Sequence, residues 1–320
     1  MVTFSIIIPV RPGGDAAALE SLRRLDETSD TFEILIAEGC SPSRQRNSAA
    51  EQARGDVLYF LDDDSQVDPN CLKTCSALLG DETVAVVGGP SLTPGSDTRL
   101  QRLFGVALAS IFGAGGSRNR YRAVGDTRTT NDSELILCNL AIRRATYLNE
   151  GGLDERLYPN EENELLDRIQ KSGHKLLHAP RMAVLRSQRT TLRLFVRQMF
   201  SYGRGRGQQT LIAGTGTVAA FIPLIFLLYL AILPLTASVP FVSVPLYAYC
   251  ALDLLFTVIA LFSSRSPYSV FLIALFPLMH ITNGFGLLGG LLGGKGGSSG
   301  KAGLQTVTTI RKKEFGQADW

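Results

Sequence analysis

Three consecutive aspartates, Asp62, Asp63 and Asp64, follow an apolar run at 57–61. Mg²⁺ and Mn²⁺ prefer carboxylate oxygens, and they commonly take one or two protein carboxylates together with substrate phosphates. Asp62 and Asp64 would face the same way if the chain stays extended, because side chains alternate along a strand. The aspartates therefore predict a divalent-metal site that also receives a nucleotide diphosphate. A solvated acidic turn is the alternative.

A second acidic pair, Glu161 and Glu162, stands where a helix is predicted to begin within 158–175. Carboxylates at a helix N-terminus interact favourably with the helix dipole, which accounts for at least one of the two without any chemistry. The functional alternative is a general base, because a neighbouring carboxylate raises the pKa of such a group. Spacing alone leaves both interpretations open.

Other polar residues carry weaker signals. Arg44 and Arg46 stand near the start of a predicted helix and could meet a phosphate, although surface arginines are common. His174 and His178 have no partner at a zinc-binding spacing, so we interpret both as structural. The five cysteines fit neither a zinc pattern nor a disulfide framework, which indicates reduced thiols in a cytosolic setting.

The elements that must position these residues alternate along the first ninety residues. This alternation predicts an α/β fold, with a parallel sheet covered by helices on both faces. Ligands of such sheets bind beyond the carboxyl ends of the strands, where the aspartates lie. Asp15 and Asp68 are predicted N-caps, the second with Pro69 at the first helical position. Strands are expected at 4–10, 32–38, 56–61 and 83–89, and helices at 15–27, 44–54 and after 68.

The middle of the chain is less regular. A strand leading into a helix is predicted at 134–144, and a Gly-rich, basic mobile loop at 113–122. Between 181 and 206 there are seven arginines and no acidic residue. Arg189, Arg193 and Arg197 recur every four residues, which predicts a basic amphipathic helix suited to an anionic membrane surface. A solvated helix packed on the domain is the alternative.

Charged residues almost disappear after this region, since 217–292 contains only Asp253 and Arg265. Apolar segments near 217–238, 242–263 and 268–292 each reach the length of about 20 residues that a bilayer requires. The third segment is either a full span or a re-entrant one. The arginine-rich stretch at 181–206, just before the first apolar segment, predicts that the domain preceding it lies in the cytosol. A flexible basic tail is expected over 293–320, including a Gly-rich linker at 293–303.

Two further properties bear on the partners and on the cellular location of the protein. The formal net charge is only +3, so the charge balance does not suggest a nucleic-acid partner. The opening "MVTFSIIIPV" has no basic segment and contains a short β-branched run, which indicates a strand rather than a cleavable signal peptide. Together with the apolar segments and the arginine-rich stretch before them, this opening leads us to expect a multi-pass protein of the cytoplasmic (inner) membrane. Its catalytic domain is expected to lie in the cytosol.

Several segments in order resemble the family 2 glycosyltransferases, inverting enzymes with the GT-A fold. The resemblance to the family covers about 3–206. The segments after it are similar to those of a membrane-attached subgroup, which includes succinoglycan-type exopolysaccharide glycosyltransferases. The segments are "FSIIIPVRP", "PSRQRNSAAEQARGDVLYFLDDDSQVDP", "CNLAIRR" and "GGLDERLYPNEENELLDRIQKSGHKLLHAP", followed by "RQMFSYGRGRG" and "HITNGFGLLGGLL". The resemblance implies a GT-A domain at 1–206, with the basic helix at 181–206, and a transmembrane region of two to three helices at 217–292.

The resemblance also implies a role for each matching position. Asp64 and Asp62 would hold a divalent metal, Mg²⁺ or Mn²⁺, and Glu162 would be the catalytic base. The donor nucleotide would meet Pro9, Arg11, Glu38, Arg46, Asn47, Asp62, Asp63 and Asp64, and the acceptor side would include Asn139, Glu161, Gln198 and Arg204.

This sequence departs from the family pattern in four places. Arg11 is followed by Pro12, where the family usually has Asn, and Glu38-Gly39-Cys40 replaces the common acidic cluster. The base would be Glu162, where Asp is usual. "QMFSY" breaks the Gln-x-x-Arg-Trp pattern of processive synthases, which argues against that class.

The predicted reaction moves one sugar from a nucleotide-diphosphate sugar, expected to be a UDP-sugar, to a hydroxyl group. The acceptor is expected to be lipid-linked or a polysaccharide at the cytosolic face of the bilayer. One alternative is transfer onto polyprenyl phosphate, as in dolichyl-phosphate sugar synthases. Another is an inactive membrane scaffold that only binds a nucleotide sugar.

Overall fold

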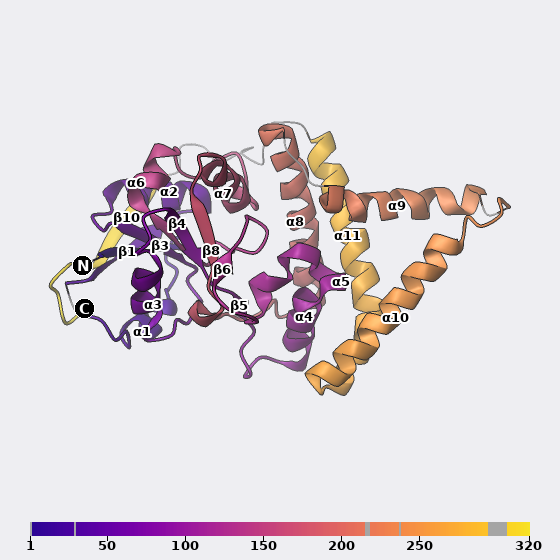
Figure 1. Ribbon diagram of the computed structural model, residues 1–320, viewed down its shortest axis with the longest axis horizontal. Helices are drawn as coiled ribbons and strands as arrows, with labels where there is room; N and C mark the ends of the chain where they lie inside the picture. The colour runs from indigo at the N-terminus through magenta and orange to yellow at the C-terminus, as the bar shows by residue number, and fades with distance from the viewer. Residues whose placement is uncertain (1, 29, 215–217, 237, 294–305) are drawn as a thin grey trace. The chain divides into compact units, whose positions relative to one another are not determined.

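The computed structural model describes residues 2–28, 30–214, 218–236, 238–293 and 306–320. The chain divides into two units (Figure 1), and the first comprises 1–92, 119–187 and 298–320. The second comprises 93–118 and 188–297. The division differs from the expected boundary at 206, because the helix at 192–213 packs on the apolar helix at 272–292.

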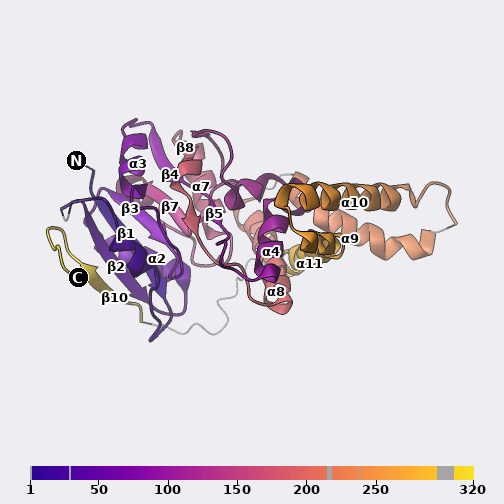
Figure 2. The same ribbon diagram turned by 90° about the horizontal axis from the view of Figure 1, so that it is seen from below.

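A mixed eight-stranded sheet forms the first unit, in the order β10-β2-β1-β3-β7-β4-β8-β6 (Figure 2). The predicted strands β1 to β4 are all present, and β1 pairs in parallel with both β2 and β3. Their apolar runs are buried almost throughout, as expected for strands covered on both faces. The strands are β1 (Phe4–Val10), β2 (Phe32–Glu38), β3 (Val57–Leu61), β4 (Val84–Gly88), β6 (Arg128–Thr129), β7 (Asn139–Arg143), β8 (Lys175–His178) and β10 (Thr308–Lys313).

The parallel arrangement expected for the first four strands is interrupted by β7, which runs antiparallel between β3 and β4. Its first residue, Asn139, pairs with the last residue of β3, Leu61. Leu140 likewise pairs with Gly88, the last residue of β4. The chain thus enters β7 from the carboxyl edge of its neighbours, so this strand must run back across the sheet.

Helices cover both faces of the sheet, as predicted. Ile6 and Ile8 pack with residues of α1 and α3, whereas Ile7 packs with residues of α2 and α7. Neighbouring residues of β1 therefore belong to two separate cores, as strand alternation requires. The helices are α1 (Ala18–Leu22), α2 (Pro42–Gln52), α3 (Cys71–Leu78), α6 (Arg144–Asn149), α7 (Glu161–Lys171) and the 3₁₀ helix η2 (Pro180–Met182).

Two predicted N-caps are wrong. The helix expected to start at Asp15 begins only after Ala17, which makes no side-chain cap. Asp68 instead closes a turn, in which its carboxylate accepts from the Asn70 N–H at 2.8 Å. The helix then begins at Cys71, because the turn occupies the residues that were expected to form its first positions.

The C-terminal residues correct the prediction of a flexible basic tail. β10 pairs antiparallel with β2, and Ile310 lies opposite Ile36. The Lys313 ammonium donates to the Phe32 carbonyl at 2.9 Å and lies 4.1 Å from the Phe32 ring centroid. β10 thus covers an edge of β2 that would otherwise leave backbone groups unpaired. The linker predicted at 293–303 lies outside the described residues, apart from Gly293.

The second unit consists of helices. Three stretches are long and apolar enough to cross a membrane, namely Val218–Thr236, Val244–Ser264 and Pro267–Leu292. The basic helix extends further than predicted, to Ala213. The segment 113–122, expected to be a loop, is mostly helical. The elements are α4 (Arg99–Ala109), α5 (Ile111–Ala114), η1 (Gly115–Tyr121, which continues into the first unit), α8 (Leu192–Ala213), α9 (Val218–Thr236), α10 (Val244–Ser264), η3 (Pro267–Phe271) and α11 (Leu272–Leu292).

α8 and α11 pack with their backbones in direct contact. A Cβ atom added to Gly203 of α8 would clash with the Asn283 carbonyl of α11. One added to Gly290 of α11 would clash with the Arg204 carbonyl of α8. Small residues on both helices therefore permit the close approach that is common between helices in membranes.

Candidate functional site

The three aspartates form a tight turn directly after β3. The Ser65 N–H donates to the Asp62 carbonyl at 3.1 Å, so the extended geometry expected for Asp62 and Asp64 is wrong. The backbone carbonyl of Asp63 accepts from the Ala18 N–H at 2.9 Å, which ties the turn to α1. Partial burial, together with the negative charges of Asp64 and Asp62, raises the pKa of Asp63. The turn therefore concentrates negative charge at the carboxyl edge of the sheet.

Arg186 bridges two of these aspartates. Its Nη2 lies 3.0 Å from Asp62 Oδ2, and its Nε donates to Asp64 Oδ1 at 2.7 Å. Asp62 and Asp64 thus do converge on one partner, which is a guanidinium. Although burial disfavours its charged form, the negative charge of Asp62 and Asp64 raises the pKa of Arg186 well above its usual value.

Backbone pairing places Arg186 beside the aspartates. The short strand β9 (Val184–Leu185) pairs in parallel with β5 (Ser91–Leu92). Leu185 also exchanges two backbone hydrogen bonds of 2.9 Å with Gln66, directly after the aspartate turn. Sequence reasoning missed this residue, because Arg186 was only one of several arginines in the basic stretch.

Arg46 joins the aspartate turn to the acidic pair on α7. Its Nη2 donates to Asp62 Oδ1 at 2.7 Å, and its Nη1 lies 3.6 Å from Glu161 Oε1. The Arg46 side chain is only 5% exposed, so both interactions are shielded from water. Arg46 thus connects carboxylates from the two predicted parts of the site, and its contact with a nucleotide stays a prediction.

Glu161 and Glu162 occupy different environments at the start of α7. Burial, and then the negative charge of Glu162, raises the pKa of Glu161 to about 8, against the opposing effect of Arg46. Among the described residues, Glu161 Oε2 is buried and makes no hydrogen bond. Glu162 instead lies 3.4 Å from Nη1 of Arg120.

Arg120 is a second residue that the sequence did not reveal. Its guanidinium donates to the carbonyls of Ser133 and Asp132 at 2.7 Å each, so its orientation is set by backbone. That orientation directs Nη1 toward Glu162. The site thus holds Glu162 in place without burying it as deeply as Glu161.

The predicted nucleotide-side residues of β1 and β2 gather at adjacent strand ends. Pro9 pairs with Ala37 in the parallel register, and Arg11 is exposed just beyond β1. Glu38 Oε1 accepts from the Gly13 N–H at 3.0 Å, and Gly13 has a φ of 67°, which glycine adopts readily. The loop after β1 is therefore ordered by Glu38. Contact of these residues with a nucleotide stays a prediction.

Gln45 reinforces the same edge, although its sequence context gave no signal. Its buried amide nitrogen donates to the carbonyls of Val10 at 2.8 Å and Ala37 at 2.6 Å. The ends of β1 and β2 are thereby held together by one side chain.

Two asparagines that are predicted to contact ligands make hydrogen bonds within the protein, and their ligand contacts stay predictions. The Asn47 side chain accepts from the Tyr147 hydroxyl at 2.6 Å and donates to the Leu153 carbonyl at 2.9 Å. Asn139 is fully buried, where it accepts from the Tyr59 hydroxyl at 2.8 Å and donates to Pro90 and Met182 carbonyls. Both amides are satisfied within the protein, so Asn47 holds a loop and Asn139 holds the core.

The remaining predicted residues, Gln198 and Arg204, lie on α8 in the second unit. Gln198 accepts from Arg189 Nε at 3.1 Å and donates to the Tyr202 hydroxyl at 2.6 Å. The acceptor-side roles of Gln198 and Arg204 stay predictions.

The aspartates do not fit a metal as they stand. Both oxygens of Asp62 and Oδ1 of Asp64 contact guanidinium groups, so a divalent cation at these oxygens would have to displace Arg46 or Arg186 or share the oxygens with them. Within the described part of the chain, no group of three or more His, Cys, Asp or Glu side chains is arranged to hold a metal ion.

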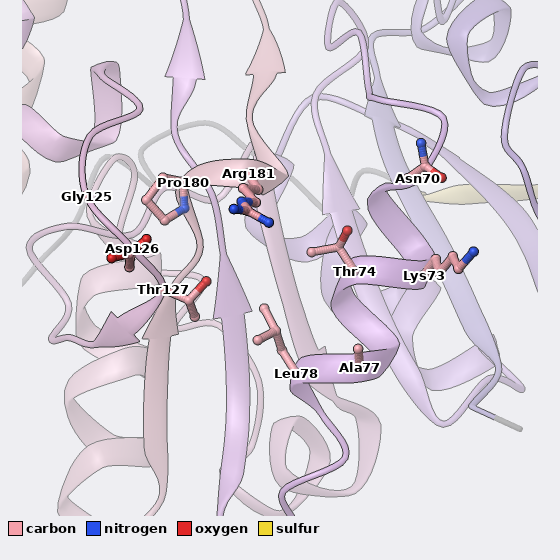
Figure 3. Close-up of a pocket in the computed structure, with 10 residues that line it drawn as sticks. All are labelled: Asn70, Lys73, Thr74, Ala77, Leu78, Gly125, Asp126, Thr127, Pro180 and Arg181. Atoms are coloured by element: carbon pink, nitrogen blue, oxygen red, sulfur yellow. The ribbon is translucent and has the colours of Figure 1, made fainter.

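An open pocket of about 610 Å³ lies elsewhere on the first unit (Figure 3). It is lined by α3 residues such as Lys73 and Thr74 on one side and by Asp126 and Arg181 on the other. None of the predicted site residues lines it. The charged cluster at the strand ends, rather than this pocket, therefore defines the candidate site.

Comparison with known proteins gives one family match. Residues 42–147, which include Arg46 and the three aspartates, match the model of "Glycosyl transferase family 2". Over 235 residues the chain is 25% identical to "Succinoglycan biosynthesis protein ExoA" of Rhizobium meliloti (strain 1021). The aligned region covers 64% of this chain and 69% of that protein.

A solved structure shares the fold. The mannosyltransferase PcManGT from Pyrobaculum calidifontis, determined in complex with GDP-Man and Mn²⁺, matches with a TM-score of 0.58 and 15% sequence identity. The match covers 91% of this chain and 87% of that one. The chain thus has a GT-A-like mixed-sheet domain followed by C-terminal helices, with a segment that matches glycosyl transferase family 2.

Proposed function

We propose that the protein is an inverting glycosyltransferase that uses a nucleotide-diphosphate sugar, with UDP as the expected nucleotide. The observation that carries the proposal is the bridge of Arg46 between Asp62 and Glu161. It unites an acidic strand end, the usual ligand edge of such sheets, with the acidic pair that begins α7. The family match and the succinoglycan relative support this assignment.

In the proposed reaction, Glu162 is the general base. Its carboxylate takes the proton of the acceptor hydroxyl while that oxygen attacks the anomeric carbon. The bond from this carbon to the nucleotide diphosphate breaks on the opposite face, so the configuration inverts. Arg120 holds the Glu162 carboxylate in position through its contact at 3.4 Å. Glu161 has a pKa of about 8 and would therefore be largely protonated at neutral pH. Its neutral carboxyl group would place no second negative charge beside the Glu162 carboxylate.

The acceptor is proposed to be a lipid-linked saccharide or a polysaccharide at the cytosolic face of the cytoplasmic membrane. Three helices in the second unit are long and apolar enough to cross a bilayer. Arg193, Arg197, Arg204 and Arg206 on α8 supply positive charge, which attracts anionic lipid head groups. The same charge favours a second candidate acceptor, polyprenyl phosphate, whose product would be a monosaccharide-lipid that mild acid cleaves.

The test incubates membranes containing the protein with a panel of radiolabelled nucleotide sugars and follows the label into lipid extract and polymer. We expect Glu162→Gln to lower transfer by about 10²–10⁴-fold, the range typical for loss of a general base. Asp167→Asn is the matched control, because Asp167 lies on the same helix in an exposed pair with Lys171. Full activity of Glu162→Gln would remove Glu162 from the mechanism, and no transfer from any donor would refute the proposed function.

A further inference from the structure

We propose that Arg186 supplies the positive charge that faces the donor's pyrophosphate, where a metal held by Asp62 and Asp64 was predicted. The inference rests on the proposed function. Its first support is competition for atoms, since Arg186 already contacts Asp62 Oδ2 at 3.0 Å and Asp64 Oδ1 at 2.7 Å. A metal at these two oxygens would have to share them with the guanidinium, against the repulsion between two cations.

The second support is the difference between the two arginines at Asp62. The Arg46 side chain is 5% exposed and lies between Asp62 and Glu161, which makes it an internal counter-charge. Arg186 is 23% exposed, so part of its side chain is accessible to a ligand. A guanidinium also offers five N–H donors in a planar fork, which matches phosphate oxygens.

The third support is the backbone that holds Arg186. The hydrogen bonds between Leu185 and Gln66 fix the residue before Arg186 to the residue two positions after Asp64. Asp62 and Asp64 then orient the guanidinium through their contacts with its Nη2 and Nε atoms. In this arrangement the aspartates position the Arg186 guanidinium as a resident cation, and this guanidinium contacts the pyrophosphate oxygens through charge-assisted hydrogen bonds.

The test measures binding of UDP and GDP to the purified full chain, in excess EDTA and in Mn²⁺. We expect wild-type affinity for the preferred nucleotide to agree within about threefold in the two conditions, since the resident cation is part of the chain. Arg186→Gln should weaken binding by about tenfold or more, and Arg186→Lys by less, because Lys keeps the charge without the fork. Arg24→Gln is the control, since Arg24 forms only an exposed pair with Glu20.

Several outcomes would overturn the inference. Wild-type binding that EDTA abolishes would do so, as would unchanged binding by Arg186→Gln. If sugar transfer is observed in either case, the proposed function stands and only the role of Arg186 falls. If neither nucleotide binds in either condition and no donor is transferred, both fall together.

A different observation leads to a second inference, on how the chain crosses the membrane. β10 belongs to the same sheet as β1, β2 and β3. Its place is secured by the Lys313 contact with the Phe32 carbonyl and by the Arg311 hydrogen bond of 2.9 Å to the Gln52 carbonyl. The chain therefore leaves one folded domain before α9 and returns to it after α11. Both ends of the helical region must lie on the same side of the bilayer.

We infer that two of the three apolar helices, α9 and α10, cross the bilayer and that α11 does not. An even number of crossings is required for β10 to rejoin the sheet. The sequence between α11 and β10, "GGKGGSSGKAGLQTV", is too short and too polar to serve as a further span. One of the three candidates must therefore remain on the side of the sheet domain.

The burial of the helices identifies that candidate as α11. The buried share of the apolar stretch is 44% in α11, compared with 17% in α10. α9 buries only Leu224 and Leu227 among its described residues. α11 packs on α8, where the Asn283 amide donates to the Met199 carbonyl at 3.3 Å. α8 carries four arginines, which are costly in hydrocarbon, so its partner α11 stays with it at the interface. The exposed apolar side chains of α9 and α10 are left for lipid.

The test uses a membrane-impermeant maleimide on sealed vesicles of known orientation, with the labelled peptides identified by mass. In a Cys250→Ala background, the exposed Cys40 marks the side of the sheet domain. Ala318→Cys reports the C-terminal tail, and Val239→Cys reports the segment between α9 and α10. We expect Ala318→Cys, and Ser266→Cys between α10 and α11, to react on the same side as Cys40, and Val239→Cys on the opposite side. Ser266→Cys on the side opposite to Cys40 would show that α11 rather than α10 crosses. Ala318→Cys on the side opposite to Cys40 would mean an odd number of crossings, and Val239→Cys on the side of Cys40 would mean that α9 does not cross. Any of these results would overturn the inference.

Discussion

Arg46 Nη1 lies 3.6 Å from Glu161 Oε1, so two buried residues from helices on the same face of the sheet are in direct contact. The same guanidinium donates to Asp62 at 2.7 Å. These contacts couple the packing of α7 to the turn after β3. The site is therefore part of the structural core of the first unit, and changes to it should affect stability as well as activity.

The buried arginine gives the first prediction. Arg46→Ala should lower the free energy of unfolding by about 1–3 kcal/mol, because it removes the hydrogen bond to Asp62 and leaves the buried Glu161 carboxyl group without this partner. Arg44→Ala, on the same helix, removes only a half-exposed pair with Glu155 and should cost at most about 1 kcal/mol. Chemical denaturation in detergent measures both. Equal losses for the two variants would contradict the buried pairing.

Glu161 should make stability depend on pH. Its folded pKa of about 8 lies above the ordinary value of 4.5, so the folded state binds more protons than the unfolded state between those values. The contribution is complete below pH 4.5 and is lost as the pH rises to 8. The difference in Tm between wild type and Glu161→Gln should therefore shift in favour of the variant as the pH rises through this window. A difference that moves in the opposite direction would show that Glu161 is not held protonated.

The partner of Arg186 provides a third prediction. Asp64→Asn should weaken nucleotide binding by about 10-fold to 100-fold, because a hydrogen bond to a charged group contributes about 1.5–3 kcal/mol. Asp68→Asn is the control, since Asp68 only caps a nearby exposed turn. Isothermal titration of UDP or GDP gives the comparison, and circular dichroism confirms that both variants are folded. Equal binding by the two variants would refute a role of Asp64 in orienting Arg186.

The C-terminal strand predicts unequal effects for two neighbouring lysines. Lys313 is buried and donates to the Phe32 carbonyl, so Lys313→Ala should destabilise the protein by about 1–3 kcal/mol. Lys312 is exposed, and Lys312→Ala should stay within about 0.5 kcal/mol of wild type. Thermal unfolding in detergent tests the pair. Similar small effects for both lysines would argue that β10 does not pair with the sheet in solution.

Adjacent glycines on α11 offer the fifth prediction. An added methyl group at Gly290 would clash with the Arg204 backbone, whereas one at Gly289 meets only the Phe200 ring at 3.7 Å. Gly290→Ala should therefore separate α8 from α11 and lower Tm. Gly289→Ala should be neutral or slightly stabilising, since Ala favours a helix over Gly by about 1 kcal/mol. If both substitutions behave alike, the close packing of α8 on α11 is wrong.

The sequence alone determined the elements whose signals are local. The buried runs of β1 to β4 were predicted because continuous apolar residues mark strands covered on both faces. The aspartates were placed at a strand end for the same reason, and the three apolar segments followed from length and composition. None of these features requires knowledge of a distant residue.

Only the tertiary structure decided which distant residues meet. Asp64 and Arg186 are 122 positions apart, and Gln52 and Arg311 are 259 apart. The position of β7, the return of β10 and the buried roles of Asn47 and Asn139 likewise depend on partners far along the chain. Periodicity and residue type describe how a segment folds locally. They do not specify which of several arginines reaches a carboxylate, because the packing of the whole sheet makes that selection.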